Sequence, residues 1–223
     1  MADVVALLPM KGHSERVTGK NLRPLAGRPL YHWVLDSLLS VPSIAAVVVD
    51  TDSEPIADDV AAAFPGVGVR ERPEDLLGDE VPMHDIVARF VAEHPDGDVF
   101  LQTHSTNPLL TGATLSRAIE AYLTDDAHDS LMSVTEWRTR FYDHRGAPLN
   151  HDPTVLLRTQ DLDPMYEENS NIYIAPRDVI TRTGHRVGSN PLLFPIDRVE
   201  STDIDEEIDF VIAECLMRWR RGG

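Results

Sequence analysis

Residues 4–21 read VVALLPMKGHSERVTGKN. The first five, Val4–Leu8, are wholly apolar, which is typical of a strand buried inside a parallel sheet. The loop from Pro9 to Asn21 then follows the carboxyl end of that strand, where open α/β sheets bind ligands. Its two glycines permit close backbone approach, and consecutive N–H groups of such a loop can hold phosphates. The stretch therefore predicts a phosphate-binding loop, with a plain connection between elements as the alternative.

The spacing of glycines and lysines in this loop excludes two common phosphate-binding patterns. A Walker P-loop has four residues between its first Gly and the Gly-Lys pair, whereas six separate Gly12 from Gly19. The dinucleotide pattern G-x-G-x-x-G is also absent. Lys11 and Lys20 are the only lysines in a chain whose other basic residues are arginines. The presence of both lysines in one loop indicates that compact, strongly hydrated ammonium groups are needed there. The alternative is that the two lysines cluster by chance.

Apolar strands alternate with amphipathic helices along most of the chain. We expect strands at 45–49, 67–70, 99–101, 130–134, 171–174 and 192–196, and helices at 29–39, 54–64, 83–94, 111–123 and 206–220. This alternation implies right-handed crossovers and a three-layer α/β fold with a mostly parallel sheet. The last helix is expected to bury one apolar face, made of Ile208, Val211, Ile212, Cys215, Leu216 and Trp219.

Residues 136–165 interrupt the alternation within a chain, 1–223, that we expect to form a single domain. They show little helical periodicity, and Arg145-Gly146-Ala147-Pro148 supplies a turn. We expect a hairpin-like arm that serves as a lid or a dimer contact, with an ordered surface loop as the alternative.

The formal net charge of −17 over 223 residues restricts the partners. Nucleic acid and anionic membranes would be repelled, and a polyanionic nucleotide would need a local positive site and a divalent metal. Cys215 is the only cysteine, so an intrachain disulfide is impossible and a reducing compartment fits. The N-terminus lacks the pattern of a signal peptide, and no apolar run reaches the length of a membrane span. We expect a cytoplasmic protein.

Asp203 and Asp205 stand two residues apart before the last helix. In an extended segment both carboxylates point the same way while Ile204 packs behind them. Mg²⁺ commonly binds one or two carboxylates together with phosphate oxygens and waters. The alternative is that these acidic groups complement the dipole of the helix that follows.

Several short segments resemble, in the same order, the acylneuraminate (CMP-sialic acid) cytidylyltransferase family. The opening loop is similar to the family's Arg-x-x-Ser-x-x-[Ile/Val/Leu]-x-x-Lys-Asn loop, with Lys11 in place of the first Arg. The later segments that carry the resemblance are Val49–Asp52 with Ile56, Arg72-Pro73-Glu74 with Leu76, Leu101-Gln102-Thr103 with Asn107-Pro108-Leu109, Arg158 with Gln160 and Asp161, Glu168-Asn169, and Asp203-Ile204-Asp205.

The resemblance implies a Rossmann-like fold of the nucleotide-diphospho-sugar transferase type. It also implies in-line attack by an acceptor oxygen on the α-phosphorus of CTP, with release of pyrophosphate. The implied catalytic residues are Lys11 and Lys20, and Mg²⁺ would bind Asp203 and Asp205. Further site residues would be Gly12, Ser14, Asn21, Arg72 and Gln102 for the nucleotide and Arg158, Gln160 and Glu168 for the acceptor. In the family an arm such as 136–165 helps to form a homodimer.

The resemblance leaves the acceptor and several side chains open. An acidic ulosonic or nonulosonic sugar ranks first, a small phosphonate is the alternative, and a non-catalytic nucleotide sensor is a second alternative. The departures lie at Lys11, at Pro82-Met83 and at the inserted His104-Ser105, close to where the ligands would bind. Arg72 has the alternative of pairing with Glu71 or Glu74. His84 and His104 are expected to make ordinary polar contacts.

Overall fold

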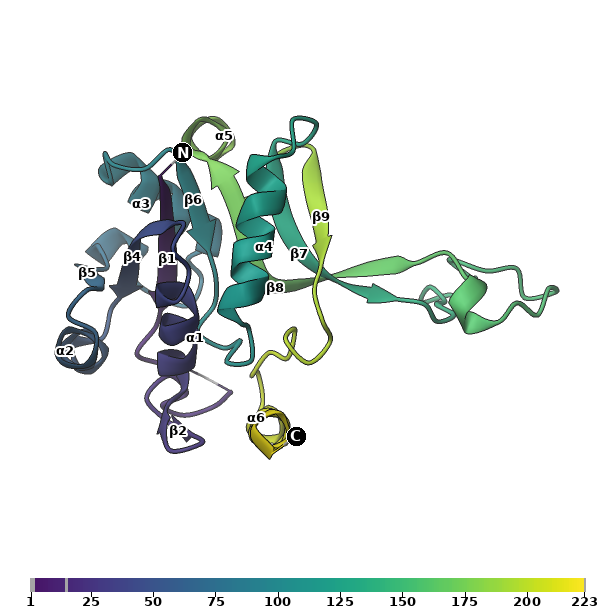
Figure 1. The fold of residues 1–223 in the computed structure, drawn as a ribbon, viewed down its shortest axis with the longest axis horizontal. Coiled ribbons are helices and arrows are strands. Elements are labelled where there is room, and N and C mark those ends of the chain that lie inside the picture. The colour runs from purple at the N-terminus through teal and green to yellow at the C-terminus, as the bar shows by residue number, and fades with distance from the viewer. Residues whose placement is uncertain (1–2, 15, 223) are drawn as a thin grey trace.

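The computed structural model describes residues 3–14 and 16–222 (Figure 1). These residues form a seven-stranded sheet in which one strand, β8, is antiparallel to its neighbours and the others run parallel. The predicted α/β class and mostly parallel sheet are confirmed. The strand order is β5 (Gly68–Glu71), β4 (Ile44–Thr51), β1 (Val4–Met10), β6 (Val99–Gln102), β8 (Met165–Pro176), β7 (Ser130–Trp137) and β9 (Pro191–Pro195).

Helices cover both faces of the sheet and make the three layers. One core joins the sheet to α1, α2 and α4, and a second joins the opposite face to α3 and α5. A two-stranded ribbon, β2 (Pro24–Leu25) with β3 (Arg28–Pro29), precedes α1. The helices are α1 (Leu30–Leu39), α2 (Glu54–Ala63), α3 (Met83–Glu93), α4 (Gly112–Leu123), α5 (Arg177–Thr183) and α6 (Glu207–Gly222), with 3₁₀ turns η1 (Glu74–Leu76) and η2 (Thr159–Asp161).

The apolar run of β1 explains its central place. Val4, Ala6 and Leu8 enter one core, while Val5 and Leu7 enter the other. A strand covered on both faces needs apolar side chains at successive positions, and all seven residues of β1 are buried. The strand ends at Met10, which pairs with Thr51 at the edge of the sheet where β4 also ends. The loop from Lys11 therefore leaves at the carboxyl ends of parallel strands, as expected.

The predicted buried face of the last helix is wrong except at Leu216, which packs, partly buried, against the small core beside the helix. Ile208, Val211 and Trp219 are 57%, 57% and 66% exposed. The helix instead packs through Phe210, Ala213 and Met217 against a small core of Val17, Leu25, Leu30, Leu109 and Ile204. Apolar residues surround much of α6, so the helical period alone gave two possible faces. The segment before the helix selects the face, because Ile204 is fully buried in the same core.

The interruption at 136–165 is an arm that projects away from the body (Figure 1). Strands β7 and β8 continue into its base, where Val134–Trp137 pair with Met165–Glu168. At its far end the predicted turn forms, with Gly146 at a φ of 80° and Tyr142 bridged to Pro148. The side chain of Asp143 accepts hydrogen bonds from two amides of this turn.

Within residues 3–14 and 16–222, no helix is long and apolar enough to cross a membrane.

Candidate functional site

The phosphate-loop candidate is closed at its end by Asn21, which is buried. Its Nδ2 donates to the carbonyl of Lys11 at 2.9 Å, which joins the two ends of the loop. Its Oδ1 accepts from the hydroxyl of Ser105 at 2.7 Å. The inserted His104-Ser105 thus has a local role, because Ser105 orients the asparagine of the loop. Sequence reasoning gave Ser105 no role, and no motif signals one.

Lys20 connects the loop to the carboxylate pair. Its Nζ donates to the carbonyl of Ile204 at 2.7 Å and lies 3.7 Å from Asp205 Oδ1. Arg16, from the same loop, binds Asp205 at 2.7 Å. Gly19 supports this arrangement with a φ of 62°, where an L side chain would be strained. Lys20 and Ile204 are 184 residues apart in the sequence and belong to different motifs, and the fold brings them together. Arg16 was missed.

Lys11 points to a different segment from Lys20. Its Nζ donates to the carbonyl of Gly78 at 2.8 Å and pairs with Asp79 at 3.3 Å. Gly12 is required by close packing, because a Cβ there would lie 2.8 Å from Cβ of Ser53. Its amide donates to Asp52 Oδ1 at 2.6 Å. Ser14 is half-buried in the same loop. The nucleotide roles of Gly12 and Ser14 stay predictions.

Arg72 is buried and ties the ends of two strands together. Its Nε donates to Asp50 Oδ1 at 2.6 Å and its Nη2 donates to the carbonyl of Met10 at 3.0 Å. These partners exclude the alternative in which Arg72 pairs with Glu71 or Glu74. Nη1 has no hydrogen-bond partner among the described residues, so one buried donor remains. Whether the nucleotide takes that donor stays a prediction.

Gln102 ends β6 and is buried beside an unpredicted cation, Arg186. Arg186 Nη1 lies 2.5 Å from Gln102 Oε1 and 3.0 Å from His104 Nε2. The guanidinium carbon lies 3.7 Å from the ring centroid of Tyr173. Burial lowers the pKa of the Arg186 guanidinium. Burial, helped by the charges of Arg186 and Lys20, lowers the pKa of His104 to about 3, so the imidazole is neutral and can accept from Arg186.

Glu168 lies where the pairing of β7 and β8 is irregular. The register shifts between Met132 and Val134, and Ser170 adopts a φ of 57°. Ser133 fills the gap by accepting from the amide of Ile172 at 2.8 Å. Such irregularities turn a side chain out of the ladder. Glu168 accepts a hydrogen bond from the hydroxyl of Tyr173 and lies 3.9 Å from Arg186.

Asp203 and Asp205 line one cavity of about 460 Å³ together with Glu168 and Asn169. Ile204 between them is fully buried, as the two-residue spacing predicted. Burial raises the pKa of Asp203, and the nearby charge of Asp205 adds to the shift. Asp203 Oδ1 finds no hydrogen-bond partner in the described part of the chain. A buried carboxylate oxygen without a hydrogen-bond partner, beside a second carboxylate, fits one Mg²⁺ that takes its other ligands from phosphates.

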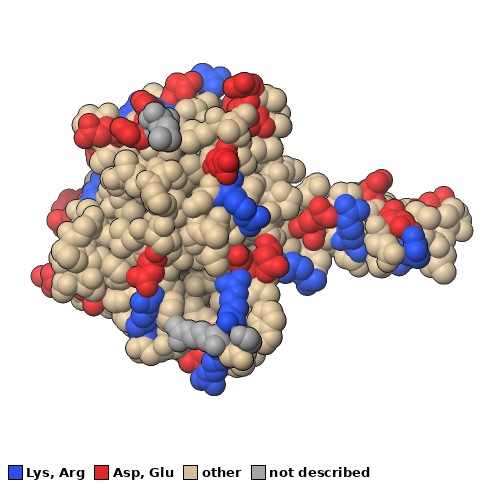
Figure 2. All heavy atoms as spheres, in the orientation of Figure 1, with Lys and Arg blue, Asp and Glu red and all other residues tan. Residues whose placement is uncertain are grey.

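No group of three or more His, Cys, Asp or Glu that could hold a metal was found among the described residues. Figure 2 shows Lys and Arg side chains interspersed with Asp and Glu around a hollow in the lower half of this face. Despite the net charge of −17, the loop brings three cations to this site, Lys11, Arg16 and Lys20.

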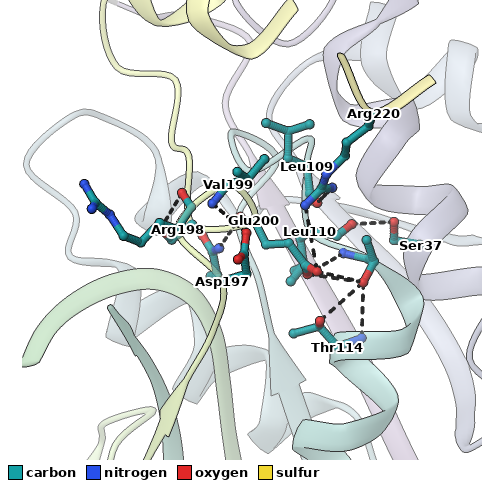
Figure 3. A network of polar contacts seen from close by, with 12 residues as sticks. Ser37, Leu109, Leu110, Thr114, Asp197, Arg198, Val199, Glu200 and Arg220 are labelled. Carbon is teal, nitrogen blue, oxygen red and sulfur yellow. Dashed lines mark hydrogen bonds and ion pairs between the residues drawn. The ribbon is translucent and has the colours of Figure 1, made fainter. Parts of the chain in front are cut away.

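A network of polar contacts holds the chain just before Asp203 (Figure 3). Glu200 accepts from the amide and the hydroxyl of Thr111, whose side chain caps the start of α4. Arg220 of α6 donates to the carbonyl of Leu109 at 2.6 Å and lies 3.9 Å from Glu200. The carbonyl of Glu200 accepts from Asn171 at 2.8 Å. The segment carrying the carboxylates is therefore fixed to α4, α6 and β8.

The arm keeps Arg158 and Gln160 away from this site in the same chain (Figure 1). Arg158 is exposed and pairs with Asp161 at 2.7 Å, while Gln160 is exposed within η2. Within one chain, the structure thus does not bring Arg158 and Gln160 to the other predicted site residues, Lys20, Gln102 and Glu168.

Comparisons with known proteins agree with this geometry. The family model described as cytidylyltransferase matches residues 5–209. The N-acylneuraminate cytidylyltransferase A of Danio rerio is 30% identical over 95% of this chain and 50% of its own length. The CMP-N,N'-diacetyllegionaminic acid synthase of Legionella pneumophila is 30% identical over 96% of each chain. This chain spans about half the length of the first relatives that it matches.

Solved structures share the fold at low sequence identity. A CTP complex of CMP:2-keto-3-deoxy-manno-octonic acid synthetase aligns with a TM-score of 0.70 at 15% identity, over 98% of this chain and 100% of that one. A 4-diphosphocytidyl-2C-methyl-D-erythritol synthase aligns with a TM-score of 0.70 at 16% identity, over 97% and 100%. These likenesses establish the Rossmann-like architecture. With a family model that matches nearly the whole chain, they show that the protein belongs to the cytidylyltransferase family.

Proposed function

We propose that this protein transfers CMP from CTP to an anionic acceptor and releases pyrophosphate, with an acidic ulosonic or nonulosonic sugar as the acceptor. The observation that carries the proposal is the contact of Lys20 with the Ile204–Asp205 segment, which makes one site of the loop and the carboxylate pair. The relatives named for cytidylyl transfer to sugar acids support the choice of donor and acceptor.

The chemistry needs positioning and charge neutralisation more than covalent work by the protein. The acceptor oxygen forms a bond to the α-phosphorus while the bond to the bridging oxygen breaks. Pyrophosphate leaves with the electron pair, and the acceptor's proton passes to water. Lys20, Lys11 and the loop amides would hold the triphosphate and stabilise the charge that develops on pyrophosphate.

Asp203 and Asp205 would hold Mg²⁺, which supplies charge neutralisation at the phosphates when bound. Asp205 is paired with Arg16 and Lys20. A bound triphosphate would offer these two cations other anionic partners and would leave Asp205 free to hold Mg²⁺. Asp205→Asn is therefore expected to raise the Mg²⁺ concentration needed for half-maximal turnover. An unchanged metal requirement would return the pair to a role at the start of the helix.

We propose a homodimer in which the arm carries Arg158 and Gln160 towards the acceptor site of the partner copy. Their distance from the site within one chain and the exposed apolar side chains of the arm support this arrangement.

The test is a pyrophosphate-release assay with CTP and Mg²⁺ and a panel of acceptors. Eight- and nine-carbon 2-keto sugar acids are compared with small alkylphosphonates, and ATP, GTP and UTP replace CTP in parallel. Release with CTP and a sugar acid is expected. Release with a phosphonate alone would change the acceptor class. Nucleotide binding without release for every acceptor would favour the sensor.

A further inference from the structure

A second cavity, of about 260 Å³, contains Arg186, the partner of Gln102. Met83, His84, Glu168, His185, Arg186 and Val187 line it. They come from the start of α3, from the irregular part of β8 and from the turn after α5. Glu168 also lines the cavity of Asp203 and Asp205, so the two cavities share a wall.

The cation of this cavity is held mainly by neutral groups. The side chain of Arg186 is 18% exposed, and its Nη1 contacts the Gln102 amide oxygen and the His104 ring nitrogen. The carboxylate of Glu168 is 3.9 Å from Nη2 and also accepts from Tyr173. A largely buried guanidinium normally has a close, often bidentate, anionic partner. Here Nη1 is engaged by neutral acceptors, and Nη2 faces Glu168, a lining residue of the cavity.

Two histidines add donors beside Arg186. The rings of His84 and His185 lie 4.4 Å apart between centroids, and both residues line the same cavity. His84 lies 3.5 Å from Asp85, which is outside the set of lining residues. The wall thus offers one guanidinium and two imidazoles against one carboxylate, Glu168. This composition suits an acid group better than a neutral ligand.

Arg186 also lies within electrostatic reach of the phosphate-loop candidate. The charges of both Arg186 and Lys20 act on His104, and its neighbour Ser105 binds Asn21 at the end of the loop. A ligand acid group on Arg186 would therefore lie near a triphosphate on Lys20, with Gln102 in contact with Arg186.

We infer that Arg186 binds the acid group of the acceptor from within the same chain and, with His84 and His185, determines that the acceptor is an anion. The inference rests on the proposed cytidylyl transfer. It adds a residue of the body to the acceptor site that the resemblance assigned to Arg158, Gln160 and Glu168. A carboxylate and a phosphonate both match a guanidinium fork, so the acid group is the shared chemistry.

The experiment compares Arg186→Gln and Arg186→Lys with Arg182→Gln, a matched control at an exposed position of α5. KM for acceptor and for CTP, kcat and the thermal midpoint are measured on the full chain. Each carboxylic acid acceptor is paired with its methyl ester, which removes the negative charge. Phosphonates are assayed beside them, and the acceptor class whose KM depends on Arg186 identifies the source of the acid group. Arg186→Gln is expected to raise acceptor KM about 10- to 100-fold and leave the KM for CTP within about 2-fold.

The preference of the wild type for acid over ester is expected to fall by a similar factor in Arg186→Gln. Arg186→Lys keeps the positive charge but lacks the planar guanidinium, so an intermediate loss of acceptor affinity is expected. This variant also tests the inference if Arg186→Gln fails to fold. An unchanged acid-to-ester preference in a folded Arg186 variant would overturn the inference while the proposed function stands. A wild type that releases no pyrophosphate with any acceptor would overturn the proposed function first.

Discussion

At the scale of single residues, Lys20 joins the two halves of the proposed site, and its substitution is the most direct test of the loop. The Lys20 side chain is 13% exposed, and its ammonium contacts both the Ile204 carbonyl and the Asp205 carboxylate. Lys20→Ala should lower kcat for pyrophosphate release about 100-fold or more, since a preorganised charge at the leaving group is lost. The assay uses saturating CTP, and a thermal melt checks the fold. A folded variant with a near-normal rate would mean that the loop is a plain connection.

His104 gives a prediction about stability and pH. Its pKa is about 3 in the folded chain, against an ordinary value of 6.5 that applies to the unfolded chain. Between these two values the unfolded state binds a proton that the native state does not, so the free energy of unfolding falls as the pH drops below 6.5. From pH 7 to 5 the loss is about 2 kcal/mol for one such group. Urea unfolding of His104→Gln should show a pH dependence flatter by this amount. Equal slopes for variant and wild type would show that the native imidazole protonates.

At the scale of elements, α6 is anchored by one narrow stripe that lies close in sequence to the carboxylate pair. Phe210 is 5% exposed in that stripe, whereas Ile212 is 45% exposed on the other side. Phe210→Ala should cost about 3 kcal/mol of unfolding free energy, as buried aromatic deletions do. Ile212→Ala should cost well under about 1 kcal/mol. Urea unfolding compares them. A larger loss for Ile212→Ala would mean that the helix docks by the face predicted from the sequence.

The predicted helices and strands agree with those of the structure where the sequence pattern is long and regular. Uniformly apolar β1 and the helices of regular period were predicted to within a few residues, because burial on a sheet dictates their patterns. The short α5 and the ribbon β2–β3 were missed, since two to seven residues carry too little periodicity. Arg186 was missed for another reason: nothing near it in sequence marks it, and only folding places it against Gln102 and Tyr173.

At the scale of the whole molecule, two exposed apolar surfaces are candidates for the interface of the proposed homodimer. One is the arm, with Leu149, Val155, Leu156 and Leu157 at 55%, 50%, 92% and 43% exposure. The other is the outer face of α6, with Ile208, Val211 and Trp219. Exposed apolar groups gathered on one element mark interaction surfaces. The arm ranks first because it also carries Arg158 and Gln160, which have no route to a site within their own chain (Figure 1).

Leu156→Asp on the arm and Ile208→Asp on α6 separate these surfaces. A charge at a position 92% exposed in the single chain should not disturb folding, but it would be buried without a partner in a dimer formed through the arm. Sedimentation velocity over a range of concentrations should show that Leu156→Asp shifts the dimer to monomer, whereas Ile208→Asp behaves as the wild type. Because the arm would complete the acceptor site of the partner, the Leu156 variant should also lose acceptor affinity but keep its affinity for CTP. The reverse pattern, with dissociation only in Ile208→Asp, would move the interface to α6 and leave Arg158 and Gln160 without a role at the site.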